Sequence, residues 1–520
     1  MKDTLAGGAF ILMAAATVNR IIGFIYQAII YRLIGPEGVG LFNLVYPVYI
    51  LIIVLATAGI PLGISKLVSE EEAKGNRRGS FEILWLAVSI LVITGTFFSL
   101  VAYLMSPLLL KYVFINKMVY PVFLCLLPGV FVISIGSAFR GFFQGLMNMK
   151  PPALGQVIEQ VIRVITGLGL AVILLPQGIQ RAAMGIAAAG VAGEIAGLLV
   201  LVTIFIKEKP RNFKVMLPNL PTAVNILRKL IELCVPITLG RLAVTVMLSV
   251  DAIIIPMMLK KAGYSTSAAT VIYGQLTGVA LTMLFIPSVI TVSLATSLVP
   301  AISDAVAQNR LSLVRSRTSE AIRITVLAGI PFIAAFLVIP DPITKVIYGS
   351  PDAGRMLSIL ALGGMMAYIQ QTTTGVLQGL GFPAIPLKNM LIGGFFKLVM
   401  IYSLNSVAGF EISGCCYAYV AFFLITATLN LVALYRNTGY RLSVWNDIFK
   451  PGVAGLFSAI VYLEVYRWTS LLTGSEAVGV LFALITGFIF YLLFVVLTGA
   501  ITKADYNRMP FLRDLFRRYL

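Results

Sequence analysis

Long apolar stretches separated by short polar ones run from one end of this 520-residue chain to the other. A helix needs about 20 residues to cross a bilayer, and each of these stretches reaches that length. Because they are apolar on all faces rather than on one, the pattern predicts helices surrounded by lipid or by one another. The fourteen predicted spans are approximately 7–33, 40–65, 81–105, 119–142, 152–175, 182–206, 229–258, 268–299, 320–348, 356–379, 384–406, 411–435, 450–470 and 477–500.

The distribution of Lys and Arg between the predicted spans gives their orientation. If the N-terminus is cytoplasmic, basic residues on the cytoplasmic side outnumber those on the opposite side about three to one. This asymmetry favours an even number of spans in the bacterial cytoplasmic membrane, with both termini cytoplasmic. Several spans exceed the minimum length, so we take Pro61, Pro287 and Pro331 as candidate kinks.

A duplicated phrase divides the chain into repeats. Residues 141–152 read GFFQGLMNMKPP and residues 375–386 read GVLQGLGFPAIP, and the same offset places Lys397 where the first copy has Arg163. The duplication predicts an all-α polytopic membrane protein of about 14 transmembrane helices, with two six-helix lobes and two further C-terminal helices. The predicted parts are an N-lobe (1–206), a basic cytoplasmic connector (207–228), a C-lobe (229–435), spans 13 and 14 (436–502) and a basic cytoplasmic tail (503–520).

Composition supports the membrane assignment and argues against several kinds of functional site. The chain is 59% hydrophobic and 12% charged, with a net charge of +18. In a bilayer such a charge reflects basic cytoplasmic loops and attraction to anionic lipid, and we expect no nucleic-acid partner. Histidine is absent and the four cysteines lack metal-ligand spacing, so we expect no metal site, no cofactor and no catalytic residue.

Charged residues inside the predicted spans are the candidates for function, because an ionisable group in hydrocarbon costs several kcal/mol unless it is paired or wet. Arg20 lies well inside the first span, and Gln27 lies seven residues further on the same helix face. Tyr26 pairs with Asn19 on a neighbouring face. We predict that Arg20, Gln27 and Tyr26 contact the substrate.

Three further cations extend this prediction to both lobes. Arg241 begins the second lobe much as Arg20 begins the first, and Arg163 and Lys397 occupy matching places in the two copies. Four cations shared between two lobes would make a basic cavity at the interface of the repeats, where such transporters bind their substrates. Because a guanidinium donates two parallel hydrogen bonds, the predicted substrate is an anion with phosphate-like oxygens.

Three acidic residues allow two interpretations each. Glu159 lies four residues before Arg163 and either neutralises it or acts as an ion-coupling group. Glu194, in a helix rich in Gly and Ala, either bonds across helices or takes part in coupling. Asp251 is either a counter-ion to an arginine or a coupling site.

Four stretches carry a resemblance to a known family. They read NRIIGFIYQAIIYRLIGPEGVGLFNLVYPVY (19–49), AGIPLGISKLVSE (58–70), FRGFFQGLMNMKPPALGQVIEQVIRV (139–164) and IPSVITVSLATSLVPAISDA (286–305). In this order they resemble the stage V sporulation protein B group of the multidrug/oligosaccharidyl-lipid/polysaccharide exporter superfamily. The resemblance implies two six-helix lobes arranged as a V and an extra pair of C-terminal helices.

The resemblance also implies a function. It points to a flippase for an undecaprenyl-pyrophosphate-linked oligosaccharide, above all lipid II for peptidoglycan or spore cortex, with cell-wall synthesis proteins as partners. The membrane potential or a coupling ion would supply the energy. Lipid II flippases of Gram-negative bacteria have the first-span pattern SRxxGFxRDxxxAR; this chain keeps Arg20 and Arg32, with Tyr26 and Gln27 at the Arg–Asp pair.

Three alternatives stay open. A flippase for another polyprenyl-linked polysaccharide precursor would use the same basic cavity. A cation-coupled drug exporter of the same superfamily should have an acidic and aromatic cavity instead. A membrane-embedded glycosyltransferase or phosphatase would place carboxylates or histidines near the membrane surface, and this chain has no histidine.

Overall fold

The computed structural model describes residues 5–209, 218–404 and 410–499, with side chains from Ile11 onward. Within these ranges the regular secondary structure is entirely helical, which confirms the predicted all-α polytopic class. The predicted tail 503–520 and residues 210–217 of the predicted connector lie outside the described residues. The chain forms two compact units, Met1–Gly274 and Gln275–Leu520.

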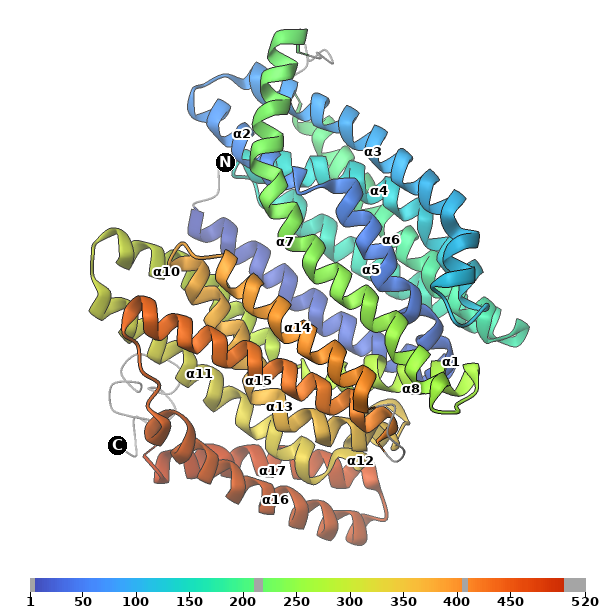
Figure 1. Cartoon of the computed structure of the whole chain (residues 1–520), viewed down its shortest axis with the longest axis vertical. Helices are drawn as coiled ribbons and strands as arrows, with labels where there is room; N and C mark the ends of the chain where they lie inside the picture. Colours follow the sequence, from blue (N-terminus) through green and yellow to red (C-terminus); the bar gives the residue numbers. More distant parts are fainter. Residues whose placement is uncertain (1–4, 210–217, 405–409, 500–520) are drawn as a thin grey trace. The chain divides into compact units, whose positions relative to one another are not determined.

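The first unit is a bundle of long helices (Figure 1). Helices α5 and α6 pack along each other and are joined by a single short 3₁₀ turn, so they run antiparallel. The described elements of this unit are α1 (Leu5–Thr57), α2 (Ile60–Ala73), α3 (Arg77–Tyr112), α4 (Val119–Gly145), α5 (Lys150–Leu174), η1 (Leu175–Gln177), α6 (Ile179–Glu208), α7 (Leu220–Lys261) and α8 (Thr266–Gln275), whose last residue begins the second unit.

Helix α1 is two helices joined at a break. Its 53 residues would form a straight rod of about 80 Å, more than twice the roughly 30 Å of bilayer hydrocarbon. Gly35 interrupts it with φ 72° and ψ 177°, a conformation that suits glycine, and Pro36 follows. The break separates the predicted spans 7–33 and 40–65. Pro61 lies in the first turn of α2, so it marks a helix start rather than a kink.

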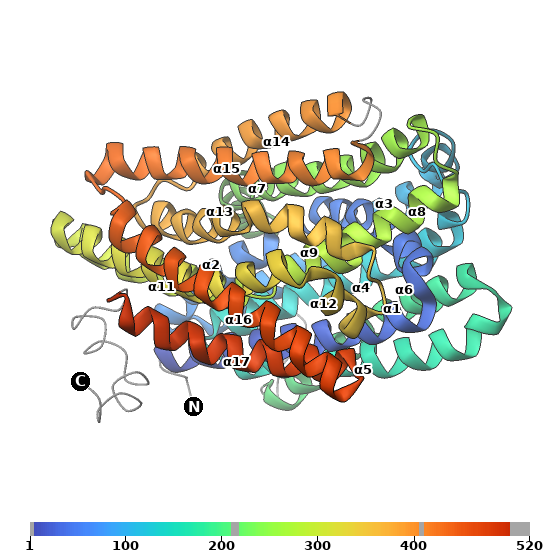
Figure 2. The same cartoon turned by 90° about the horizontal axis from the view of Figure 1, so that it is seen from below.

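The second unit is also helical, and Figure 2 shows α16 and α17 side by side in it. Gly487 of α17 makes room for the buried ring of Tyr462 on α16. The described elements are η2 (Leu276–Ala280), α9 (Leu281–Leu284), α10 (Ser288–Ala307), α11 (Leu311–Val338), α12 (Pro340–Tyr348), α13 (Ala353–Gly379), α14 (Ala384–Leu404), α15 (Glu411–Thr438), η3 (Val444–Phe449), α16 (Lys450–Thr473) and α17 (Glu476–Leu497).

By length and composition, 13 segments of the described chain can cross a membrane, compared with the fourteen predicted. The two counts divide the chain differently. Ile11–Ala73 counts once although it contains the break at Gly35, and the predicted span 268–299 forms two segments, Thr266–Leu284 and Ser288–Ala307. Pro287 lies in the short link between them. Helix α13 is too polar to be counted, because two glutamines and three threonines follow one another at 370–374.

The polar stretch of α13 is buried and hydrogen-bonded inside the second unit. The Asn430 amide of α15 donates to the hydroxyls of Thr373 and Thr374, at 3.2 and 3.3 Å. The Asn389 amide of α14 donates to the Asn430 side-chain oxygen at 2.9 Å. An interior that excludes water requires such internal pairing, because an unpaired polar group costs several kcal/mol. These bonds tie α13, α14 and α15 together.

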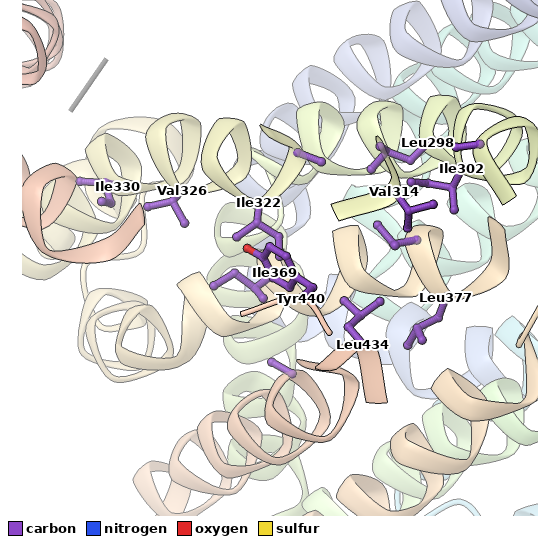
Figure 3. Close-up of a cluster of buried hydrophobic side chains, with 14 of the residues drawn as sticks. Leu298, Ile302, Val314, Ile322, Val326, Ile330, Ile369, Leu377, Leu434 and Tyr440 are labelled. Atoms are coloured by element: carbon purple, nitrogen blue, oxygen red, sulfur yellow. The ribbon is translucent and has the colours of Figure 1, made fainter. Parts of the chain in front are cut away.

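Apolar side chains from α10, α11, α13 and α15 form the core beside this polar stretch (Figure 3). Tyr440, which follows α15, lies in the same core with its ring close to Ile322 and Ile369. The link between α15 and η3 is therefore anchored to the bundle. The core residues labelled in Figure 3 are Leu298, Ile302, Val314, Ile322, Val326, Ile330, Ile369, Leu377, Leu434 and Tyr440.

The boundary between the compact units falls later than the predicted boundary between the lobes. The sequence places that boundary in the connector 207–228, whereas the first unit extends to Gly274. The reason is that α7 packs against α1 and α2. The division into two repeated lobes therefore stays a prediction about the duplicated sequence.

The Asn430 network should contribute measurably to stability. We expect Asn430→Leu to lower the free energy of unfolding by about 1–3 kcal/mol, because it leaves Asn389 and two threonines without their partner. The measurement is thermal unfolding of the purified protein in detergent. The matched control is Asn437→Leu on the same helix, whose exposed amide bonds only to Ala433 within α15. Equal losses for the two variants would contradict the prediction.

Candidate functional site

Four charged side chains from three helices meet inside the first unit. Arg140 of α4 contacts Glu159 of α5 at 3.0 Å and Glu194 of α6 at 3.2 Å through Nη2. Arg163 of α5 contacts the other oxygen of each carboxylate through its own Nη2, at 2.7 and 3.3 Å. Two cations and two anions thus form a closed ring, which we call the charge tetrad (Arg140, Glu159, Arg163, Glu194).

The local sequence explains why the tetrad closes. Glu159 and Arg163 are four residues apart, so they share a face of α5. On α6, Gly193 and Gly197 face them, and a Cβ at Gly193 would lie only 2.7 Å from the Glu159 carbonyl oxygen. The absence of side chains at these two positions lets α6 approach α5 closely enough for Glu194 to reach both arginines.

The predicted residues of the first span do not share one environment. Arg20 is exposed and Gln27 is half-buried, whereas Tyr26 is buried, with its ring filling the space beside Gly167 of α5. The Tyr26 hydroxyl has no hydrogen-bond partner within the described structure. Tyr26 therefore packs between helices, and Arg20 and Gln27 are the residues of this group that stay accessible.

The predicted residues of α7 also differ in exposure. Arg241 is exposed, whereas Asp251, ten residues further along the helix, is only 3% exposed. Tyr273 of α8 is buried as well and faces the Asp251 carboxylate. Asp251 therefore belongs to the packed interior of the first unit, and Arg241 to its surface.

Lys397 of α14 is the buried cation of the second unit. Its side chain is 3% exposed, and its ammonium lies 4.7 Å from the ring centre of Tyr419 and 5.2 Å from that of Phe422. Both rings belong to α15 and offer their negatively polarised faces to the charge. A cation that matches Arg163 in the sequence is thus packed against two aromatic rings.

The two helix pairs that carry these cations pack in the same register. In the first unit, Gly155 of α5 lies against Leu201 of α6. In the second unit, Asn389 and Asn430, at the corresponding places of α14 and α15, share a hydrogen bond. The sequence duplication is therefore also a duplication of packing.

The same correspondence holds around the two cations. Gly193 of α6 lies against Arg163, and Phe422 of α15 lies against Lys397. In the first copy the glycine leaves room for the charged side chains, whereas in the second copy an aromatic ring fills the corresponding space. The repeats share the position of the cation but not the way in which it is neutralised.

The structure brings together Glu159, Arg163 and Glu194, three of the residues chosen from the sequence. It adds Arg140, which lies near the end of the predicted span 119–142 and was not among the residues chosen from the sequence. The signal that could have found it is its place directly before the duplicated phrase, one residue ahead of Gly141. Arg20 and Arg241 are exposed and Lys397 lies in the second unit, so their common cavity stays a prediction.

The described residues offer no cluster of three His, Cys, Asp or Glu side chains that could hold a metal ion. The tetrad carboxylates are already occupied by guanidinium groups. What the tetrad can do chemically is exchange partners: either arginine can bind an external oxyanion, and either glutamate can take a proton.

Comparisons with known proteins agree over the whole chain. Residues 5–306 match the family described as Polysaccharide biosynthesis protein. Stage V sporulation protein B of Bacillus subtilis (strain 168) is 31% identical over 99% of this chain and 100% of its own length. Lipid II flippase MurJ of the same organism is 24% identical over 85% of each chain. A solved structure of lipid II flippase MurJ in an inward closed conformation has a TM-score of 0.70 at 15% identity, covering 98% of this chain and 100% of that chain.

The helical fold and the buried charges define a multi-pass membrane protein of the multidrug/oligosaccharidyl-lipid/polysaccharide exporter superfamily. The chain belongs to the polysaccharide biosynthesis protein family and, within the superfamily, to the stage V sporulation protein B group.

The tetrad should behave as one electrostatic unit. We expect Arg140→Gln to lower the free energy of unfolding by about 3–5 kcal/mol, because removing one partner leaves a buried charge uncompensated. Adding Glu194→Gln should restore much of the loss, since it returns the ring to neutrality. The measurement is thermal unfolding of single and double variants in detergent.

The control for this comparison of single and double variants is Arg78→Gln, which breaks the ion pair between Arg78 and Glu82 near the start of α3. The Arg78 side chain is 69% exposed, so its loss should cost at most about 1 kcal/mol. If the Arg140 and Glu194 substitutions acted additively, the two residues would not be coupled and the tetrad would be incidental.

Proposed function

We propose that this protein is a flippase that moves an undecaprenyl-pyrophosphate-linked glycan from the cytoplasmic to the outer leaflet. The proposed substrate is lipid II, for peptidoglycan or spore cortex. The protein would transport this substrate without altering it chemically. Both termini would lie in the cytoplasm, and cell-wall synthesis proteins would be its functional partners.

The observation that carries the proposal is a cation held inside each repeat at the same place, Arg163 in one and Lys397 in the other. Cations in hydrocarbon are costly and mark sites for anions or counter-ions. One relative bears a name that fits an anionic lipid-linked substrate, lipid II flippase MurJ. A pyrophosphate joins the lipid tail to the sugars in such substrates and is the group that these cations would bind.

The proposed mechanism is alternating access. The cavity between the repeats opens to the cytoplasm, and Arg20 captures the pyrophosphate together with Arg241 and Lys397. Gln27 adds a hydrogen bond to the same substrate. The lobes then rock about the bound head group, which leaves on the outer side. The break at Gly35 lies between the first two spans and offers one point where a helix can change direction.

The energy would come from the membrane potential or from an ion gradient. One charge moved across 100 mV is worth about 2.3 kcal/mol. We propose Glu159, Glu194 and Asp251 as the coupling groups, since all three are carboxylates placed inside helices of the first unit. Their protonation or ion binding would alter the local charge as the lobes move.

A second candidate function is supported by the family description, which names polysaccharide biosynthesis rather than peptidoglycan. Under this alternative the substrate is another polyprenyl-linked polysaccharide precursor, bound through the same pyrophosphate. A cation-coupled drug exporter is disfavoured, because a site for organic cations should not be lined by Arg20, Arg241 and Lys397.

Arg20 provides the sharpest test of the substrate site. We expect Arg20→Ala to abolish transport while the protein level in the membrane stays normal, because the exposed side chain binds substrate and supports no packing. The measurement is transfer of lipid-linked glycan in vesicles, normalised to protein. The control is Arg228→Ala, an exposed arginine of α7 paired with Glu232, which should transport normally. Normal transport by a well-expressed Arg20→Ala variant would remove Arg20 from the site.

Complementation distinguishes the two substrates. The protein is expressed in a bacterium whose own lipid II flippases can be switched off, and lipid II in the outer leaflet is measured. Rescue supports lipid II as the substrate. Failure with the protein present in the membrane would favour the second candidate, and purified protein would then be assayed with other undecaprenyl-pyrophosphate-linked glycans.

A further inference from the structure

The charge tetrad is electrically balanced. Each guanidinium contacts both carboxylates, with Arg163 on one oxygen of each glutamate and Arg140 on the other. The two positive and two negative charges cancel. While both carboxylates are ionised, the ring has no net charge and its two arginines do not attract an anion.

The second unit shows that the corresponding three helices can be joined largely by neutral side chains, with Lys397 as a buried cation among them. Helices α13, α14 and α15 are held by the neutral side chains of Asn389, Asn430, Thr373 and Thr374. Charged groups in such surroundings lose hydration, and replacing a buried ion pair by neutral residues is often neutral or stabilising. Helix packing alone therefore gives no reason for the charges of the first unit.

The second copy keeps one cation of the tetrad and lacks both carboxylates and the other arginine, since Arg140 falls on Thr374 at the offset of the duplicated phrase. At the offset that carries Arg163 onto Lys397, Glu159 falls on Gly393. On the following helix Gly193 corresponds to Phe422, so the next residue, Glu194, corresponds to Phe423. Both copies keep the cation, and only the first copy surrounds it with two groups that can take up a proton.

Protonation would change what the ring can bind. A proton on one carboxylate removes one negative charge and leaves the ring with a net charge of +1. Arg163 then has a weakened partner, and its Nε already has no hydrogen-bond partner within the described structure. Its side chain is 28% exposed, compared with 13% for either glutamate, so Arg163 is the more accessible partner of each ion pair, with its Nε buried.

We propose that Glu159 and Glu194 form a proton site that switches Arg163 between two partners, the carboxylates and a phosphate-like oxyanion. When the anion binds, one carboxylate oxygen takes up one proton from solvent and its ion pair with Arg163 breaks. When the anion leaves, the proton is released and the ring closes. The inference rests on the proposed function for the identity of the anion, which is the pyrophosphate of the transported lipid.

The groups around the site do not supply another switch of this kind. Helix α1 presents Tyr26, Tyr46 and Tyr49 to the tetrad charges, and α5 adds the uncharged Gln160. The charged residues of α2 are the exposed Lys66, at its middle, and Glu70, Glu71 and Glu72 near its end, and α3 carries its charged residues near its two ends. Those of α6 outside the tetrad lie near its two ends: Arg181, Lys207 and Glu208.

Reciprocal linkage makes the proposal measurable. If anion binding takes up one proton, lowering the pH must strengthen anion binding, by at most about tenfold for each pH unit. The probe is sulfate, because its own charge stays constant over the accessible pH range. The full chain in lipid nanodiscs is titrated by infrared difference spectroscopy, which follows protonated carboxyl groups, with and without sulfate.

In the wild-type protein we expect sulfate to move a carboxyl titration midpoint to higher pH. Glu194→Gln and Glu159→Gln should each abolish the movement, and Arg163→Gln should abolish sulfate binding at the site. The matched control is Glu82→Gln, which removes a carboxylate that is 14% exposed and paired with an arginine but lies outside the tetrad. A midpoint that sulfate leaves unchanged, or a movement that persists in both glutamate variants, would overturn the proposal.

A transport experiment distinguishes failure of the proton site from failure of the proposed flippase function. Lipid-linked glycan transfer is measured in vesicles across a range of pH for the wild type and Glu194→Gln. Loss of the pH dependence in the variant supports the proton site. Transfer with an identical pH profile in both proteins overturns the proton site and leaves the flippase function standing. Absence of transfer by the wild type, with lipid II or another glycan, overturns the flippase function itself.

Discussion

The need to neutralise charge where water is scarce governs the interior of this protein. Hydrocarbon offers no counter-ions, so every buried cation requires a partner supplied by another helix. The first unit meets this need with two carboxylates around Arg140 and Arg163, and the second with two aromatic rings around Lys397. The residues beside each cation also affect the distance between the two helices that carry it. Glycines bring α6 close to α5, and Phe422 fills the corresponding place in the other copy.

Hydropathy alone is enough to recognise most of the fold. Apolar length identifies the spans, since a bilayer demands it, and the duplicated phrase correctly indicates helices that pack in the same way. At α13 consecutive Gln and Thr residues lower the mean hydropathy, although its apolar length still predicts the span 356–379. Their hydrogen bonds to Asn430 come from α15, far along the sequence. A local pattern carries no information about such a partner.

In the candidate site, only the contact between residues close together in the sequence could be predicted from the sequence. Glu159 and Arg163 pair across one helical turn, and the spacing alone suggests it. The contributions of Arg140 and Glu194 depend on how three helices meet, which no spacing reveals. Tyr26, which the sequence pairs with Asn19 in a polar stripe, has its ring packed against Gly167. A large aromatic side chain is drawn into helix packing whatever its neighbours are.

The break at Gly35 has a consequence for how the protein is made. A continuous helix of 53 residues would present the ribosome-bound membrane machinery with one segment too long for the bilayer. With Gly35 and Pro36 between them, its two apolar halves can enter together as a hairpin. Helix α8 packs onto this turn later, where the Ser267 hydroxyl donates to the Glu37 carboxylate and Gly274 lies against the Pro36 carbonyl. The first two spans can therefore enter as a pair, and the contacts that fix their turn form only after α8 has been synthesised.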